Sequence, residues 1–302
     1  MDVLGRLLGL LALLLIGTGL RTSGILDESR TQRLNDVAYY VALPALIFVS
    51  TYDRAIDELL TPALFLGLLA VVFGTAGLAW VVHRSRPASG RQSVAIVQSY
   101  HSNIGYLGLP LVAATFDAQV TAIASVVLGV VSLTQVPLTV LVLTTINGAD
   151  ATVGSELGRL ARNPVLVTLL AGLTVGSLGL SLPAVVTGGL DVLGTLALPI
   201  ALLCVGASLQ LDRPDVDVGA TGSVVALKIA LMPALGWLVF SLLSVDAATF
   251  TATIVMLGTP TAVSTYVFAN ELGGDETFAS LNVFLTTLAS VASLFVLIQA
   301  VS

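Results

Sequence analysis

Long apolar segments recur along the whole of this sequence, and they constrain its fold more than any other feature. A segment of about 20 apolar residues can cross a bilayer as a helix, because the hydrocarbon core is about 30 Å thick. Only 10% of the 302 residues are charged, against about 25% in a soluble domain. The sequence therefore predicts an all-α polytopic membrane protein and excludes a soluble fold.

Short polar stretches divide the chain into ten transmembrane helices. The first segment does not open on a basic region, so we expect a membrane span there rather than a secretory signal peptide. The segments run over Met1–Leu20, Leu34–Ser50, Pro62–His83, Gln92–Thr115, Gln119–Ile146, Pro164–Leu180, Asp191–Leu209, Gly219–Leu242 and Ala247–Asn270, with a tenth that ends near Val301.

The ten segments form two groups of five, which predicts a 5+5 inverted repeat. Residues 1–146 hold the first repeat, 147–162 a cytosolic connecting loop, and 163–302 the second repeat. An Ala-Leu-Pro run ends at Pro44 and again at Pro199, an offset of 155 residues. Pro110 and Pro260 are offset by 150 residues. Because five is odd, the second copy enters the membrane inverted, as in many secondary transporters.

The distribution of basic residues predicts the orientation. If both termini are extracellular, nine arginines fall in inward loops, two fall on the outward side, and Lys228 lies inside the membrane. Positive residues are enriched in cytoplasmic loops. We therefore expect a multi-pass protein of the plasma membrane with the 147–162 connection in the cytosol.

Two of the apolar segments carry residues that oppose an uninterrupted helix. The fourth contains Gly105, Gly108 and Pro110, and the ninth contains the 258–264 run with Pro260. Glycine adds entropic cost, and proline removes a donor and clashes with the preceding turn. Broken helices inside a membrane are tolerated where they are buried in protein or line a watery cavity. We therefore predict that segments four and nine form a ligand site.

Three motifs resemble the auxin efflux carrier family, whose bacterial and archaeal members are often labelled malonate or organic-acid transporters. They are Tyr40–Leu46, Asn103–Leu111, and Pro260–Ser264 followed by Phe268-Ala269-Asn270. Many relatives have an asparagine where Ser264 stands, and the long central loop of the plant exporters is absent.

The resemblance implies a fold shared with bile acid:sodium symporters and sodium/proton antiporters. In that fold, spans one, two, six and seven form a scaffold, and spans three to five and eight to ten form a mobile domain. The broken spans four and nine cross inside the mobile domain, which moves like an elevator. The resemblance also implies a homodimer formed through the scaffold.

Crossed broken helices would place two half-helix N-termini near the bilayer midplane. Each carries about half a positive charge and free N–H donors, so we expect a carboxylate to bind there. Asn103 could contact that ligand or repair the freed backbone, and Gly105 could admit the ligand or serve helix packing. The residues expected to bind substrate are Asn103, Gly105, Pro110, Pro260, Thr261 and Ser264.

Two ionisable residues lie at intramembrane depth. His101 could carry a proton, or pack beside the site as a neutral, hydrogen-bonded ring. Lys228 could attract an anion, replace a bound sodium ion, or snorkel to the cytosolic face. No carboxylate falls at midplane depth, which weakens a sodium or proton antiporter reading. We expect no metal site and no cofactor.

The function expected is a secondary transporter, of the efflux carrier type, for small organic anions such as auxin-like compounds or other mono- and dicarboxylates. The alternative with the same fold is a sodium-coupled organic anion symporter of the bile-acid type. The alternative from a different class, an intramembrane enzyme or sensor, lacks a recognisable motif, so we expect no enzyme. The partners are the substrate anion, the lipid bilayer and a second copy of the chain. A net charge of −6 argues against nucleic acid.

Overall fold

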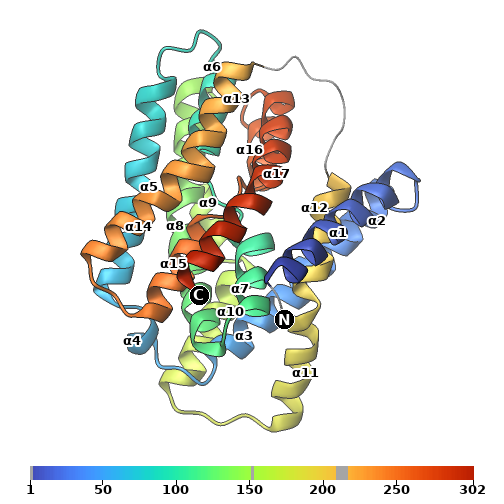
Figure 1. Cartoon of the computed structure of the whole chain (residues 1–302), viewed down its shortest axis with the longest axis vertical. Helices are drawn as coiled ribbons and strands as arrows, with labels where there is room; N and C mark the ends of the chain where they lie inside the picture. The colour runs from blue at the N-terminus through green and yellow to red at the C-terminus, as the bar shows by residue number, and fades with distance from the viewer. Residues whose placement is uncertain (1–2, 151–152, 209–216) are drawn as a thin grey trace. The chain divides into compact units, whose positions relative to one another are not determined.

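Helices make up the regular structure of the computed structural model, which describes residues 3–150, 153–208 and 217–302 (Figure 1). The first half contains α1 (Val3–Thr22), α2 (Glu28–Val37), η1 (Ala38–Ala42), α3 (Leu43–Thr51), α4 (Ile56–Leu59), α5 (Pro62–His83), α6 (Ser89–Gln98), η2 (Ile104–Gly108), α7 (Leu109–Thr115) and α8 (Ala118–Asn147). The second half contains α9 (Val153–Leu160), α10 (Pro164–Ser177), α11 (Ala184–Thr195), α12 (Ala197–Ser208), α13 (Val218–Val225), η3 (Ala226–Leu231), α14 (Met232–Leu242), α15 (Ala247–Leu257), α16 (Ser264–Glu271) and α17 (Glu276–Val301). The three η elements are π-helical turns.

Several of these helices are long and apolar enough to cross a membrane. Within the described residues six qualify, over Glu28–Thr51, Pro62–His83, Ala118–Asn147, Ala184–Ala207, Val218–Leu242 and Glu276–Val301. A seventh arises if the pair Gly154–Leu160 and Pro164–Ser177, bent by 56°, is one span. Shorter apolar helices cover Ala12–Thr22, Ile104–Thr115 and Ala247–Leu257. The prediction of a helical, multi-span membrane protein is confirmed at this level.

Helix boundaries depart from the sequence-based expectation at three places. The second segment begins earlier, at Glu28, because the Asp27 carboxylate accepts a hydrogen bond of 2.8 Å from the Arg30 N–H and caps α2. The helix α11 begins before the expected start at Asp191. The 147–162 connection, expected as a loop, contains α9, whose apolar residues recur at helical spacing.

Each π-helical turn is followed, one residue later, by a proline. Pro44, Pro110 and Pro233 stand in the first turns of α3, α7 and α14, immediately after η1, η2 and η3. Proline lacks an N–H and clashes with the carbonyl four residues earlier. A π turn widens the helix locally and so accommodates both defects. The chain therefore continues as a helix through these prolines instead of breaking.

The chain divides into two compact units, and unit 1 comprises Met1–Pro62, Gly105–Gly129 and Ala161–Leu209. Within it, α1 lies against α12, and α10 and α11 lie against α3 (Figure 1). The α1–α12 contact needs a glycine, because a Cβ on Gly206 would lie 2.1 Å from the Leu14 carbonyl oxygen.

Unit 2 comprises Ala63–Ile104, Val130–Leu160 and Gln210–Ser302. Its described core brings α6, α13, α15 and α16 against α17, the long C-terminal helix. Polar threonine, serine, glutamine and asparagine side chains are buried among the apolar ones in this unit. Both interrupted segments, α6 with its continuation and α15 with α16, have their breaks here.

Several helix starts in the two halves of the chain differ by similar numbers of residues, 197 − 43 = 154 for α3 and α12 and 264 − 109 = 155 for α7 and α16. The starts of α5 and α13 differ by 218 − 62 = 156 residues, those of α6 and α15 by 247 − 89 = 158, and those of α8 and α17 by 276 − 118 = 158. The offset of 150 between Pro110 and Pro260 lies below these values. The reason is that Pro260 lies in a break, whereas Pro110 lies inside a helix behind a π turn.

Candidate functional site

The two interrupted helices meet at their breaks. The first break, 99–103, follows α6, and the second, 258–263, separates α15 from α16. Ser102 and Thr261 form an antiparallel bridge between them. The Asn103 N–H donates to the Pro260 carbonyl at 2.8 Å, and the Ala262 N–H donates to the His101 carbonyl at 3.0 Å. The breaks thus satisfy part of each other's freed backbone, as burial in a membrane protein requires.

Side chains from two long helices pair the remaining backbone groups. Gln135 of α8 accepts from the Ser102 N–H at 3.0 Å and donates to the Ser102 carbonyl at 3.1 Å. Thr286 of α17 accepts from the Thr261 N–H at 3.3 Å. The first break is therefore repaired by Gln135, and Asn103 does not perform the backbone repair that its sequence position allowed.

Gln98, the last residue of α6, joins four neighbours. Its amide nitrogen donates to the Thr265 hydroxyl at 3.0 Å and to the Ala279 carbonyl at 2.9 Å. Its amide oxygen accepts from Asn282 at 2.9 Å. Its carbonyl accepts the Thr261 hydroxyl at 2.5 Å. The Thr261 hydroxyl proton, expected to serve substrate binding, is thus committed to holding the two breaks together.

Asn103 differs from these neighbours because its side chain has no such partner. The residue is only 3% exposed. In the described part of the chain, its amide forms none of the hydrogen bonds that occupy Gln98, Gln135 and Asn282. Its amide atoms are not among the fully enclosed polar atoms that lack a partner, so a ligand or water can reach them and complete their hydrogen bonds. The ligand interpretation of Asn103 is therefore the one its surroundings favour.

The other expected binding residues are distributed over both units. Ser264, exposed at the start of α16, and the buried Pro260 belong to unit 2 together with Asn103. Gly105 and Pro110 belong to unit 1. A Cβ on Gly105 would come no closer than 3.9 Å to Leu128, so helix packing does not require a glycine there. Pro110 was expected to mark the unwound stretch and does not, because η2 carries the helix through it.

His101 and Tyr100 share one partner on α8. The His101 Nδ1 lies 2.8 Å from the Thr139 hydroxyl, and the Tyr100 hydroxyl lies 3.2 Å from the same oxygen. His101 is 2% exposed, and its ring centroid lies 6.1 Å from that of Phe268. His101 is therefore a hydrogen-bonded ring packed at the breaks. The sequence left open this role and that of a proton carrier, and the contacts agree with the packed ring.

Lys228 is fully buried in η3. Its ammonium donates to the Leu257 carbonyl at 2.9 Å and to the Met232 sulfur at 3.3 Å. Snorkelling to the cytosolic face is therefore wrong for this lysine, because its charged end is held inside unit 2 at the end of α15. Sequence reasoning flagged Lys228 by depth but could not find its partners, which are a backbone carbonyl and a thioether.

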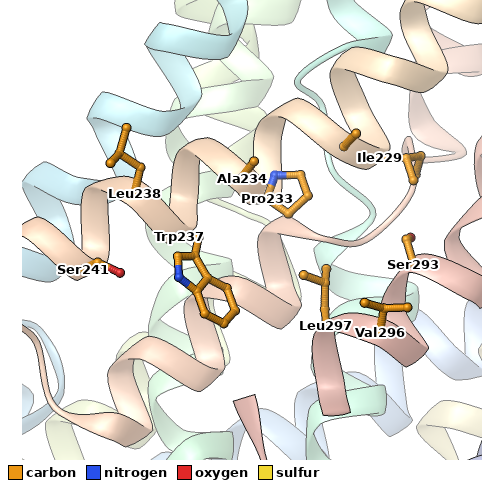
Figure 2. A pocket seen from close by; sticks show the side chains of 10 residues that line it. Ile229, Pro233, Ala234, Trp237, Leu238, Ser241, Ser293, Val296 and Leu297 are labelled. Atoms are coloured by element: carbon orange, nitrogen blue, oxygen red, sulfur yellow. The ribbon is translucent and has the colours of Figure 1, made fainter. Parts of the chain in front are cut away.

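A separate apolar groove opens on the surface of unit 2. It has a volume of about 660 Å³ and lies along η3, α14 and α17 (Figure 2). Figure 2 shows Trp237 and Leu238 from α14 and Val296 and Leu297 from α17 among its walls. The residues of the paired breaks do not line it, and its lining is mostly apolar, with Ser241, Ser293 and the indole of Trp237 as its polar groups.

Comparison with known proteins gives the family. Residues 2–298 match the sequence model of the family described as Membrane transport protein. The chain belongs to that family. Its resemblance to auxin efflux carriers is thereby confirmed.

Relatives of this membrane transport protein align along most of their length. A protein of Methanothermobacter thermautotrophicus named "Uncharacterized transporter" is 28% identical, over 95% of this chain and 94% of its own. A protein of Rhizobium meliloti named "Putative malonate transporter" is 29% identical, over 86% of this chain and 83% of its own. An "Uncharacterized transporter" of Methanocaldococcus jannaschii is 24% identical, over 93% and 92%.

Proposed function

We propose that this protein is a secondary transporter, of the efflux carrier type, for small organic anions, with mono- and dicarboxylates as the substrate class. Membership of a transport family and a relative named for malonate support the class. The observation that carries the proposal is the Asn103 amide, which has no hydrogen-bond partner among the described residues and belongs to the first of the two paired breaks.

The proposed anion site lies in unit 2 and uses two kinds of donor. The Asn103 amide can donate two N–H bonds to a carboxylate. Ser264 opens α16, and its backbone N–H forms no hydrogen bond with any described residue. A helix N-terminus favours negative charge, and α16 begins directly after the second break, which pairs with the break that contains Asn103. The Pro260 carbonyl positions Asn103 through its backbone.

We further propose the ten-span inverted repeat as the architecture. Offsets of 154 to 158 residues between the starts of several helix pairs support two copies of one five-segment pattern. The pairing of the two breaks supports a crossing of spans four and nine. Unit 2 contains spans eight to ten, span three and parts of spans four and five. That grouping supports an elevator-like movement of those spans, in a homodimer built through the others.

Flux through reconstituted vesicles tests the function. Purified protein in liposomes should accumulate labelled malonate, or another short mono- or dicarboxylate, in exchange for unlabelled anion inside. Protein-free liposomes and liposomes with the Asn103→Ala variant are the controls. Absence of flux for every short carboxylate tried would contradict the proposal. Flux that requires sodium strictly would favour the bile-acid-type symporter instead.

A further inference from the structure

The end of α15 is a position where a cation is favoured. Leu257 is the last residue of this helix, and its carbonyl is among the last four that lack an intrahelical partner. The helix dipole adds partial negative charge at the same end. Neighbouring carbonyls already have partners: the Ile254 carbonyl accepts from Gly258 at 2.9 Å, and the Met256 carbonyl accepts from the Thr259 hydroxyl at 2.8 Å. The Leu257 carbonyl is left for Lys228.

The ammonium of Lys228 is fixed from two sides. It is 0% exposed and lies 2.9 Å from the Leu257 carbonyl oxygen. The Met232 sulfur accepts from it at 3.3 Å and also accepts from the Ser102 hydroxyl at 3.5 Å. Lys228 is thus bonded directly to the edge of the second break and reaches the first break through one sulfur atom.

No carboxylate balances this charge within the part of the chain that the structure describes. The ion pairs of unit 2 involve arginines instead, with Arg86 and Arg91 on Asp217, Arg91 on Asp275, and Arg159 on Glu156 and Glu271. An ammonium has three donors, and the two partners of Lys228 are neutral. A buried charge that lacks an opposite charge is costly and by default functional in a membrane protein.

We propose that the end of α15 is a cation site that the Lys228 side chain fills permanently, so that the protein needs no free cation there. The tethered ammonium supplies one positive charge next to the paired breaks, and the carboxylate of the substrate supplies the missing negative charge. The second half of this inference rests on the proposed function. The first half, a cation site occupied by a side chain, stands on the contacts of Lys228 alone.

Two substitutions separate charge from volume. Lys228→Ala removes the ammonium and opens the space that it filled, so a small cation can enter. Lys228→Met removes the charge but keeps a chain of similar length in that space. The probes are sodium, ethylammonium and choline chloride at equal concentration, and choline is too large for the site.

The first readout is thermal unfolding of the purified variants, which does not depend on any substrate. Ethylammonium or sodium should raise the midpoint of Lys228→Ala relative to choline, because a ligand that binds only the folded state stabilises it. The same salts should leave Lys228→Met and the unaltered protein unchanged. Equal midpoints for Lys228→Ala in all three salts would overturn the cation site. If this variant is recovered only when it is purified with ethylammonium or sodium, the recovery supports the site, and failure to recover it in any salt contradicts the site.

The second readout is carboxylate flux in liposomes. Both variants should transport at least about 10-fold more slowly than the unaltered protein in choline, since an interaction with a charged group is lost. Ethylammonium should restore Lys228→Ala but not Lys228→Met. Normal flux in both variants would refute the counter-charge role while leaving the transport function intact. Absence of flux in the unaltered protein would instead refute the transport function, and the unfolding experiment would still decide the cation site.

Discussion

Gln135 holds both backbone groups of Ser102, accepting from its N–H at 3.0 Å and donating to its carbonyl at 3.1 Å. A helix that stops inside a membrane leaves such groups without partners. Here one side chain from α8 replaces both of the bonds that the helix would have made. The first break is therefore a built feature of unit 2, and its stability depends on a residue more than thirty positions away.

Gln135→Ala should destabilise the protein strongly. The substitution leaves a donor and an acceptor of Ser102 buried without partners, at a cost of about 1–3 kcal/mol for each group. The midpoint of thermal unfolding in detergent should fall clearly. The matched control is Gln32→Ala, because Gln32 is exposed on α2 and bonds only to Asp36. That control should change stability by no more than about 0.5 kcal/mol, and equal effects for the two substitutions would contradict the role of Gln135.

The location of the breaks shows where sequence reasoning succeeds and where it fails. Hydropathy placed the helical segments well, because apolar length is a local property. The first break was expected around Gly105 and Pro110, yet it lies at 99–103, which contains neither glycine nor proline. Its cause is tertiary: pairing with the second break and with Gln135 outweighs continuation of the helix. The π turn before Pro110 accommodates the missing N–H and the steric clash of the proline, so the helix need not break there. No sequence pattern predicted that turn.

Asn103→Ala should impair transport much more than folding. The amide has no hydrogen-bond partner to lose among the residues that the structure describes, so the unfolding midpoint should change little. If it binds the substrate carboxylate, its loss should weaken binding about 10- to 150-fold, the effect of 1.5–3 kcal/mol. Initial rates of malonate flux at equal protein density measure this. Wild-type affinity in the variant would show that the amide does not contact the anion.

The control for Asn103 must be an amide without structural partners. Asn147, the first residue of the 147–162 connection, is not such an amide. Asn147 ends α8, donates to the Leu272 carbonyl at 2.9 Å and accepts from Ser93 at 3.0 Å. Gln299→Ala, an exposed position near the end of α17, is the better control and should leave both flux and stability unchanged.

Transport by the unaltered protein should persist when sodium is replaced by choline. Hard cations such as sodium prefer oxygen ligands and carboxylates in particular. The end of α15, where a cation is favoured, is already occupied by Lys228. Flux of a short carboxylate should therefore agree in the two salts at equal ionic strength. A strict requirement for sodium would contradict this expectation and would place a free cation elsewhere in the protein.

Acid should selectively remove the stabilisation that Asp217 provides. This residue caps α13, and the Ala220 N–H, followed by Arg86 and Arg91, holds the pKa of its carboxyl below the usual 3.8. A carboxyl whose pKa is lower in the folded state stabilises the fold at pH values above its ordinary pKa. This stabilisation is lost as the pH falls through the folded-state pKa. Asp217→Asn should therefore be less stable than the unaltered protein at pH 7, and the difference should shrink as the pH falls below 3.8. Asp57→Asn, an exposed position on α4, is the control. A difference between Asp217→Asn and the unaltered protein that stayed constant from pH 7 to pH 3 would rule out the charge as its source.

The α9 segment should face the cytosol. If both termini are extracellular and the chain has ten spans, nine of the twelve basic residues lie on the same side as this connection, in agreement with the positive-inside rule. Ser155→Cys in a Cys204→Ser background reports the side, because Ser155 is exposed on α9 and the native cysteine is buried. An impermeant maleimide should label the variant in inside-out vesicles and leave it unlabelled in intact cells. Labelling in intact cells would reverse the orientation, and with it the proposal that both termini are extracellular.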